Sequence, residues 1–207
     1  TVSMSNAGTW SVDGSALDDE KHPHITMLRN AWLKDAPPMA LHVSGDIPSA
    51  SGLGSSAALS AAVGAAMHHL SNPGKGIDRD GLSAFAHRAE AHAQQGRASP
   101  MDASTSVEGG VVVVSNRKES MGRWLYTRRL TTPEGERTWE VHGLKPPEDE
   151  VYLVLGNTGV HAPTSQQVAM VAHALEAAPS RIQEIQAIGA IARRGLAALV
   201  KGDYEAV

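Results

Sequence analysis

The order of apolar and polar residues predicts a chain that mixes strands and helices without a regular alternation. Alternating residues over 41–47 predict a half-buried strand that ends before Pro48, because proline offers no N–H to a sheet. Apolar periodicity and alanine-rich runs predict helices over 25–33, from the serines near 55 to about 70, and over 80–94, 164–178 and 179–200. β-Branched runs predict buried strands over 111–114 and 151–155. Residues 1–20 are expected to be polar and turn-rich, and residues 116–148 are expected to form a hairpin-like region. This mixture of strands and helices favours an α+β fold.

Composition removes several classes of function. The 207 residues carry 22 acidic and 18 basic side chains, and the basic run over 123–129 is expected to be a solvated strand or loop, so we expect no nucleic-acid partner. The absence of cysteine excludes a disulfide scaffold, a thiolate zinc site and cysteine catalysis. It fits a reducing compartment, and we expect a cytoplasmic protein. No apolar run approaches about 18 residues, so we expect no membrane span.

A glycine- and serine-rich segment stands between the first predicted strand and the alanine-rich helix. The first N–H groups of a helix have no partner within it, and the helix dipole adds partial positive charge there. Gly52 and Gly54 permit positive φ and a close approach of phosphate to the backbone. Ser55 and Ser56 add hydroxyls that can cap the helix or reach a metal. The segment therefore predicts an anion site.

Two other interpretations of this segment stay open at this point. It can be a turn followed by a serine-capped core helix. It also fits the dinucleotide-binding pattern in Gly52-x-Gly54-x-x-Ala57, with Asp78 at a suitable distance downstream. The polar turn over 71–75 lies where the second strand of that unit should run, which argues against it. No lysine follows in the place that an ordinary P-loop requires.

Two carboxylates follow the segment. Glu90 lies near the end of a predicted helix, and Asp102 follows a turn rich in glycine, serine and proline. In phosphoryl transfer one carboxylate can carry the metal while another orients or deprotonates the attacking hydroxyl. The alternative is an exposed helical glutamate and an aspartate that caps the next element. Among the histidines, none shows zinc spacing, and His87 and His92 are expected on a solvated helix face.

Three segments resemble those of a known family. The first, Pro48-x-x-x-Gly52-Leu53-Gly54-Ser55-Ser56-Ala57-Ala58, resembles the phosphate-binding signature of the GHMP kinases. The second, Gly96-Arg-Ala-Ser-Pro-Met-Asp102, is similar to the catalytic segment in the archaeal mevalonate kinases of that family. The third, residues 155–164, is similar to the strand and loop that open the family's second domain. The resemblance extends from about Leu41 to the end of the sequence.

The resemblance implies a two-domain GHMP kinase fold of the α+β class. Residues 1–148 would belong to an N-terminal, ribosomal-protein-S5-like, ATP-binding domain, and 149–207 would begin a ferredoxin-like C-terminal domain. The family's N-terminal lysine-bearing segment and its C-terminal glycine-rich motif are not found in this sequence. We therefore expect both domains to be incomplete and the sequence to be a fragment that lacks both ends.

The resemblance also implies roles for single residues. Asp102 would be the catalytic aspartate, Ser56 and Glu90 would hold Mg²⁺, and Thr164 would be a substrate-side threonine, although a helix N-cap alone would explain it. The ATP phosphates would bind along Pro48, Gly52, Leu53, Gly54, Ser55, Ser56 and Ala57. Glu90 and Asp102 are 12 residues apart, one more than in most of the family.

The implied reaction transfers the γ-phosphoryl group of ATP to the 5-hydroxyl of mevalonate, a step of isoprenoid synthesis. ATP and mevalonate are the expected partners, and a homodimer is one expected assembly. Two alternatives stay open. One is a GHMP kinase for another alcohol, such as homoserine, a sugar or phosphomevalonate. The other is a GHMP-fold module that binds a ligand without turnover.

Overall fold

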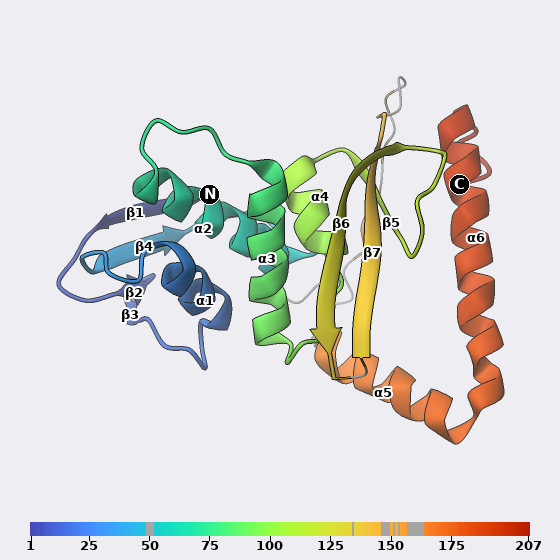
Figure 1. Ribbon diagram of the computed structural model, residues 1–207, viewed down its shortest axis with the longest axis horizontal. Helices are drawn as coiled ribbons and strands as arrows, with labels where there is room; N and C mark the ends of the chain where they lie inside the picture. Colours follow the sequence, from blue (N-terminus) through green and yellow to red (C-terminus); the bar gives the residue numbers. More distant parts are fainter. Residues whose placement is uncertain (49–51, 134, 146–149, 151, 153, 157–163) are drawn as a thin grey trace.

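The computed structural model describes the chain except for residues 49–51, 134, 146–149, 151, 153 and 157–163. Its elements, in order, are β1 (Val2–Asn6), β2 (Ser11–Val12), β3 (Ser15–Ala16), α1 (Pro23–Trp32), β4 (Met39–Val43), α2 (Ser55–Ser71), α3 (Arg79–Ala93), α4 (Met101–Glu108), β5 (Val111–Ser115), β6 (Arg123–Thr132), β7 (Gly135–Leu144), α5 (Thr164–Ala177), the 3-10 helix η1 (Pro179–Arg181) and α6 (Ile182–Lys201). Helices and strands are mixed as an α+β fold requires (Figure 1).

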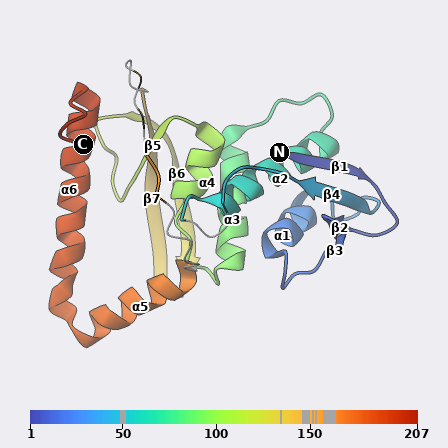
Figure 2. The same ribbon diagram turned by 180° about the vertical axis from the view of Figure 1, so that it is seen from behind.

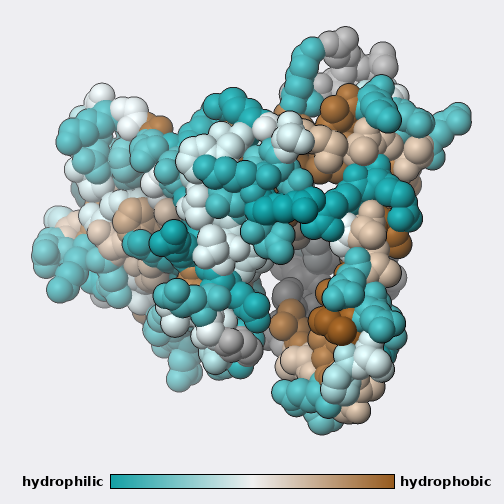
Figure 3. Space-filling model, turned by 45° about the vertical axis from the view of Figure 1, so that its right-hand side comes forward, coloured by the Kyte–Doolittle hydropathy of each residue, from teal (hydrophilic) through white to brown (hydrophobic). Residues whose placement is uncertain are grey.

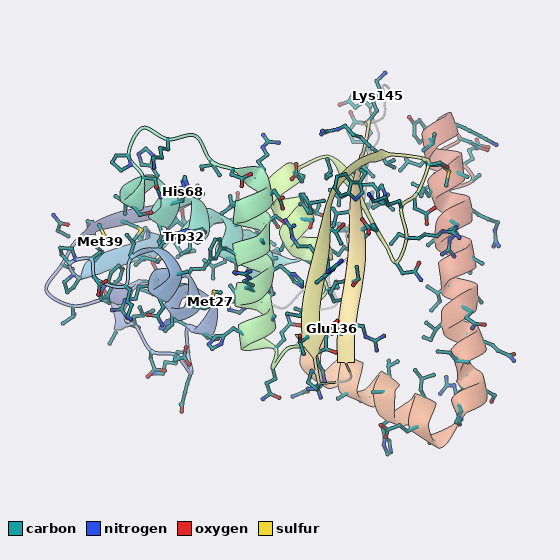
Figure 4. The ribbon with its side chains drawn as sticks, viewed as in Figure 1. Met27, Trp32, Met39, His68, Glu136 and Lys145 are labelled. Carbon is teal, nitrogen blue, oxygen red and sulfur yellow. The ribbon has the colours of Figure 1, made fainter. Side chains whose placement is uncertain are left out.

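The N-terminal part of the molecule is a four-stranded sheet in the order β1-β4-β2-β3 that shares a core with α1, α2 and α3. That core consists of Val12, Ile25, Leu28, Leu33, Leu41, Val63, Met67 and Ala89. Trp32 of α1 extends it, since its ring lies 4.4 Å from the ring of Phe85 and 6.2 Å from that of His68, centroid to centroid (Figure 4). The sheet and α1 thus pack against α2 and α3 through this shared core.

A second sheet, in the order β5-β7-β6, lies on the other side of α3 (Figure 1). β6 and β7 form the long hairpin expected for the region after residue 116, with a register irregularity between Trp124 and Tyr126. Arg128 of β6 is buried and its guanidinium lies 2.6 Å from the carboxylate of Asp80 at the start of α3. The basic run over 123–129 is therefore a strand, but the expectation that it is solvated is wrong at Arg128.

Three buried alanines join α2, α3 and α4. Ala57, Ala86 and Ala103 are fully buried and form a cluster of their own, one from each helix. Figure 2 shows α4 beside α3 on the side of the second sheet. A methyl group is the smallest side chain that fills a core, so three helices that meet through alanines approach closely. We call these residues the alanine cluster.

The C-terminal helices α5 and α6 form an arm that runs along the outside of the second sheet (Figure 1). The arm contacts the loop between β5 and β6 through Arg193, whose Nε lies 4.0 Å from Glu119 Oε1. Among the described residues of α6 only Ala198 is buried, and Figure 3 shows apolar surface along the arm. No helix in the described ranges combines the length and apolarity needed to cross a bilayer.

Several predicted elements differ from those observed. The first predicted strand is shifted, because β4 spans Met39–Val43 and leaves 44–47 outside the sheet. The turn-rich N-terminal stretch contains β1, which pairs in antiparallel fashion with β4. The strand predicted over 151–155 is wrong for its described residues, since Tyr152, Val154 and Leu155 are exposed and outside any strand. β5 is half-buried rather than buried, because it lies at a sheet edge.

Candidate functional site

The start of α2 is shaped by two glycines. Gly54 is the N-cap residue and has φ of 69°, and Gly52 has φ of 75°, so both take the positive φ expected from the sequence. Gly54 has no side chain to accept hydrogen bonds, and its carbonyl oxygen already receives the N–H of Ala58 at 3.0 Å. The N–H groups of the first turn thus lie at the positive end of a 17-residue helix.

Glu90 of α3 is buried against this helix start. Its Oε2 accepts a hydrogen bond of 2.8 Å from Ser56 Oγ, and its Oε1 accepts one of 3.1 Å from Ser60 Oγ. The two serines are four residues apart on α2, so they present their hydroxyls on the same face. Only 4% of Glu90 is exposed. A buried carboxylate needs such donors, because water no longer solvates it.

Two further groups complete the surroundings of Glu90. Gln94 Nε2 donates to Oε2 at 3.1 Å, and His24 Nε2 lies 3.2 Å from Oε1 without the alignment of a hydrogen bond. Burial alone would raise the pKa of Glu90, but His24 and the hydroxyls of Ser56 and Ser60 outweigh it and lower the pKa below its ordinary value. Glu90 is therefore an ionised carboxylate at neutral pH.

Asp102 lies in the first turn of α4, directly beside Gly54. A methyl group placed on Gly54 would lie 3.3 Å from Asp102 Cγ, so the carboxyl group rests against the bare backbone of that glycine. Partial burial raises the pKa of Asp102, and the negative charge of Glu90 raises it further. The site thus holds two carboxyl groups whose environments move their pKa values in opposite directions.

The donors at this site suit a hard cation. Ser56 and Glu90 offer only oxygen atoms, which Mg²⁺ prefers, and Mg²⁺ in phosphoryl-transfer sites takes one or two carboxylates while substrate phosphates supply further oxygens. In the described ranges, no three His, Cys, Asp or Glu side chains gather into a metal-binding group. The oxygen pair of Ser56 and Glu90 fits a metal that also takes oxygen atoms from a phosphate ligand.

Residues 23–110 match the family described as GHMP kinases N terminal domain. This stretch contains the loop 52–57, Glu90 and Asp102, which the structure brings together at the start of α2. Residues 23–110 belong to the GHMP kinase family. The resemblance expected from the sequence is thus confirmed.

Individual relatives of this GHMP kinase domain share only part of the chain. The mevalonate kinase of Methanothermobacter thermautotrophicus is 41% identical over 86 residues, which cover 41% of this chain and 27% of that kinase. A solved structure from Listeria monocytogenes, assigned as the homoserine kinase ThrB, covers 98% of this chain and 60% of its own, with 17% identity and a TM-score of 0.44.

The remaining residues predicted for the site take varied positions. Pro48 and Leu53 are exposed, whereas Ala57 is buried in the alanine cluster, so only its backbone faces the helix start. Thr164 is the first residue of α5, and its side chain is outside what the structure describes. A cleft of about 1120 Å³ between the second sheet and the end of α6 is lined by none of the predicted site residues.

The dinucleotide-binding alternative is wrong. Asp78, its required acid, is the N-cap of α3, where its side chain accepts the N–H groups of Asp80 and Gly81. No strand lies between α2 and α3 in this fully described stretch. The segment that follows α2 therefore cannot form the second strand of a βαβ unit.

Sequence reasoning missed three polar residues near the site. Ser60 could have been found, since it lies one helical turn after Ser56. His24 could not, because it comes from α1 and reaches Glu90 only through the packing of α1 on α3. The expectation of a solvated His87 is wrong: it is 2% exposed and its Nε2 lies 3.0 Å from the carbonyl oxygen of Ala98. His92 is exposed, as expected.

Proposed function

We propose that the chain contains the phosphate-binding part of an ATP-dependent kinase that phosphorylates mevalonate. The observation that carries the proposal is the meeting of three groups at the start of α2: the positive-φ glycines, the Ser56–Glu90 pair and Asp102. Membership of residues 23–110 in the GHMP kinases supports the reaction class, and the partial match to a mevalonate kinase supports the acceptor.

In this proposal the backbone of the loop binds the phosphates of ATP. The N–H groups of Gly54, Ser55 and Ser56 face anions at the helix start, with Gly52 allowing the chain to fold around them. Pro48, Leu53 and Ala57 shape the same loop through their backbone. Ser56 and Glu90 would hold Mg²⁺, which supplies charge neutralisation for the phosphate oxygens.

Asp102 acts on the acceptor. The hydroxyl oxygen of mevalonate forms a bond to the γ-phosphorus, the bond from that phosphorus to the bridging oxygen of ADP breaks, and Asp102 receives the hydroxyl proton. A raised pKa makes its carboxylate a better proton acceptor as long as it stays ionised at the working pH. Thr164 is proposed to face the acceptor from the beginning of a second domain, with the division between residues 148 and 149.

The test is transfer of radiolabel from γ-labelled ATP to a panel of alcohols by the full-length protein. Label in mevalonate, lost in Asp102→Asn, is the expected result. Label only in homoserine, a sugar or phosphomevalonate would replace the acceptor and keep the kinase. Tight binding of ATP without label in any acceptor would overturn the proposal in favour of a non-catalytic module.

A further inference from the structure

The turn between α3 and Asp102 contains two successive residues with left-handed backbone. Gln95 has φ of 53° and Gly96 has φ of 85°. The N–H of Gly96 donates to the carbonyl of Ala91 at 2.7 Å, and that of Arg97 donates to Gln94 at 3.1 Å. A residue other than glycine persists in this conformation only where its surroundings fix it. Its own backbone hydrogen bonds close the turn, and contacts from neighbouring elements can fix the chain that follows it.

His87 of α3 supplies such a contact to Ala98, two residues after the turn. Its Nε2 is 3.0 Å from the carbonyl oxygen of Ala98, and since a carbonyl only accepts, this nitrogen carries the proton. Trp139 of β7 packs edge-on against the imidazole, with ring centroids 5.7 Å apart. Burial lowers the pKa of His87, so the ring is neutral at pH 7 and donates from a fixed tautomer.

A second buried contact holds the segment after Asp102. Ser104 Oγ lies 3.4 Å from Ser83 Oγ of α3, and the hydroxyl of Tyr126 donates to the same Ser83 oxygen at 3.0 Å. Ser83 and His87 are four residues apart, and Glu90 follows three residues later, so all three share one face of α3. One helix face thus contacts the chain on both sides of Asp102 and carries Glu90 as well.

We propose that His87 is a positioning residue that, through the carbonyl of Ala98, sets the place of Asp102 relative to Glu90 and the start of α2. Its effect on turnover rests on the proposed function. The phosphate loop leads into α2, whose Ser56 contacts Glu90 rather than His87. Loss of the His87 contact therefore displaces the acceptor side of the site and leaves nucleotide binding in place.

The kinetic test compares His87→Leu with His87→Gln in the full-length protein. His87→Leu removes the donor and lowers kcat by about tenfold to a hundredfold, the scale of a small displacement of reacting groups, while the KM for ATP stays unchanged. His87→Gln keeps an N–H that can reach the carbonyl and recovers most of the kcat. The matched control is His142→Leu, because His142 of β7 is as buried as His87 and accepts the N–H of Glu119 in the loop between β5 and β6, away from the site. Its kcat stays within about twofold of the parent, the effect expected of a change far from the site.

The second test does not depend on activity. Amide hydrogen exchange of His87→Leu should rise in residues 97–101 and stay unchanged at the start of α2, whereas in His142→Leu it should rise near residue 119. A protein that phosphorylates no alcohol would end the proposed function, and the exchange pattern would still decide this inference. Full kcat in His87→Leu, or exchange that rises evenly over the whole chain, would overturn it.

Discussion

The alanine cluster and the C-terminal arm show what the same kind of apolar helix becomes with and without close neighbours. α2 buries Ala57, Ser60, Ala61, Val63, Gly64 and Met67. On α6 the isoleucines are exposed, with Ile188 at 60% and Ile185 at 43%, and Ala198 is the one buried residue described. Small side chains let α2, α3 and α4 pack together, whereas apolar periodicity alone does not bury α6.

The two regions also differ in what they do to a carboxylate. Glu90, held by serine hydroxyls in the protein interior, is fixed in one place and faces the start of a helix. Glu184 on the arm pairs with Arg181 at 3.0 Å, but both side chains are exposed to water. Exposed ion pairs contribute little to stability. Burial therefore distinguishes Glu90, a candidate metal ligand, from an ordinary surface carboxylate.

The largest effect is expected for Asp102→Asn. Turnover should fall by at least about 10²-fold, because the amide cannot accept the hydroxyl proton. Affinity for ATP should barely change, since the proposed function places Asp102 beside the acceptor rather than the nucleotide. The control on the arm is Asp203→Asn, an exposed aspartate that should leave turnover intact. Steady-state kinetics with mevalonate measures both, and a similar kcat in the two variants would contradict the role of Asp102.

Overpacking of the alanine cluster is expected to come next. Ala86→Leu inserts three carbons where three helices meet and should lower the free energy of unfolding by about 1–3 kcal/mol. The same change on the arm, Ala187→Leu, falls on an exposed residue and should stay within about 0.5 kcal/mol of the parent. Urea denaturation of both variants compares the regions, and equal values would show that the cluster is not closely packed.

Metal dependence is expected to change by a smaller factor. If Ser56 and Glu90 hold Mg²⁺ as proposed, Ser56→Ala and Glu90→Gln each remove one oxygen ligand, so both should raise the Mg²⁺ concentration that gives half-maximal activity. Glu184→Gln on the arm should not. A response of Ser56→Ala without one of Glu90→Gln would move the second ligand to another carboxylate and refute the assignment of Glu90.

The smallest effects concern pH, and they have opposite signs at the two site carboxylates. The pKa of Asp102 is raised above its ordinary 3.8, so its ionised form destabilises the fold, and Asp102→Asn should raise the melting temperature at pH 7 but not below about pH 3. The pKa of Glu90 is lowered below 4.5, so Glu90 stabilises the fold above that pH and loses this effect as the pH falls through its lowered pKa. Glu90→Gln should therefore lower the melting temperature at pH 7, with a difference that shrinks in acid. Calorimetry at pH 7 and below about pH 3 measures the melting temperatures of both variants. A change of the same sign in the two variants at pH 7 would contradict these assignments.

Local signals in the sequence predicted most of the helices and the shape of the loop. The positive φ of Gly52 and Gly54 and the extent of α2 follow from residue types alone, because backbone freedom and helix propensity are local properties. The family resemblance drew on the same local segments.

The predictions that proved wrong concern residues whose surroundings depend on packing between distant segments. Nothing in the sequence near His87 or Arg128 shows that β6 and β7 cover that side of α3, so both residues were expected in solvent. The strand predicted at Tyr152 failed for the opposite reason, because an apolar run needs a neighbouring strand before it joins a sheet. His24 could be placed beside Glu90 only by the tertiary structure.

The alanine cluster also bears on how the site forms as the chain folds. Its three helices follow one another directly, and the Ser56–Glu90 contact spans only 34 residues. The entropy cost of closing a loop grows with its length, so this contact costs less than a contact between the two ends of the chain. During synthesis every residue of the alanine cluster leaves the ribosome before the first residue of the β6–β7 hairpin. The contacts of His87 with Trp139 and of Ser83 with Tyr126 form later, because Trp139 and Tyr126 belong to the hairpin.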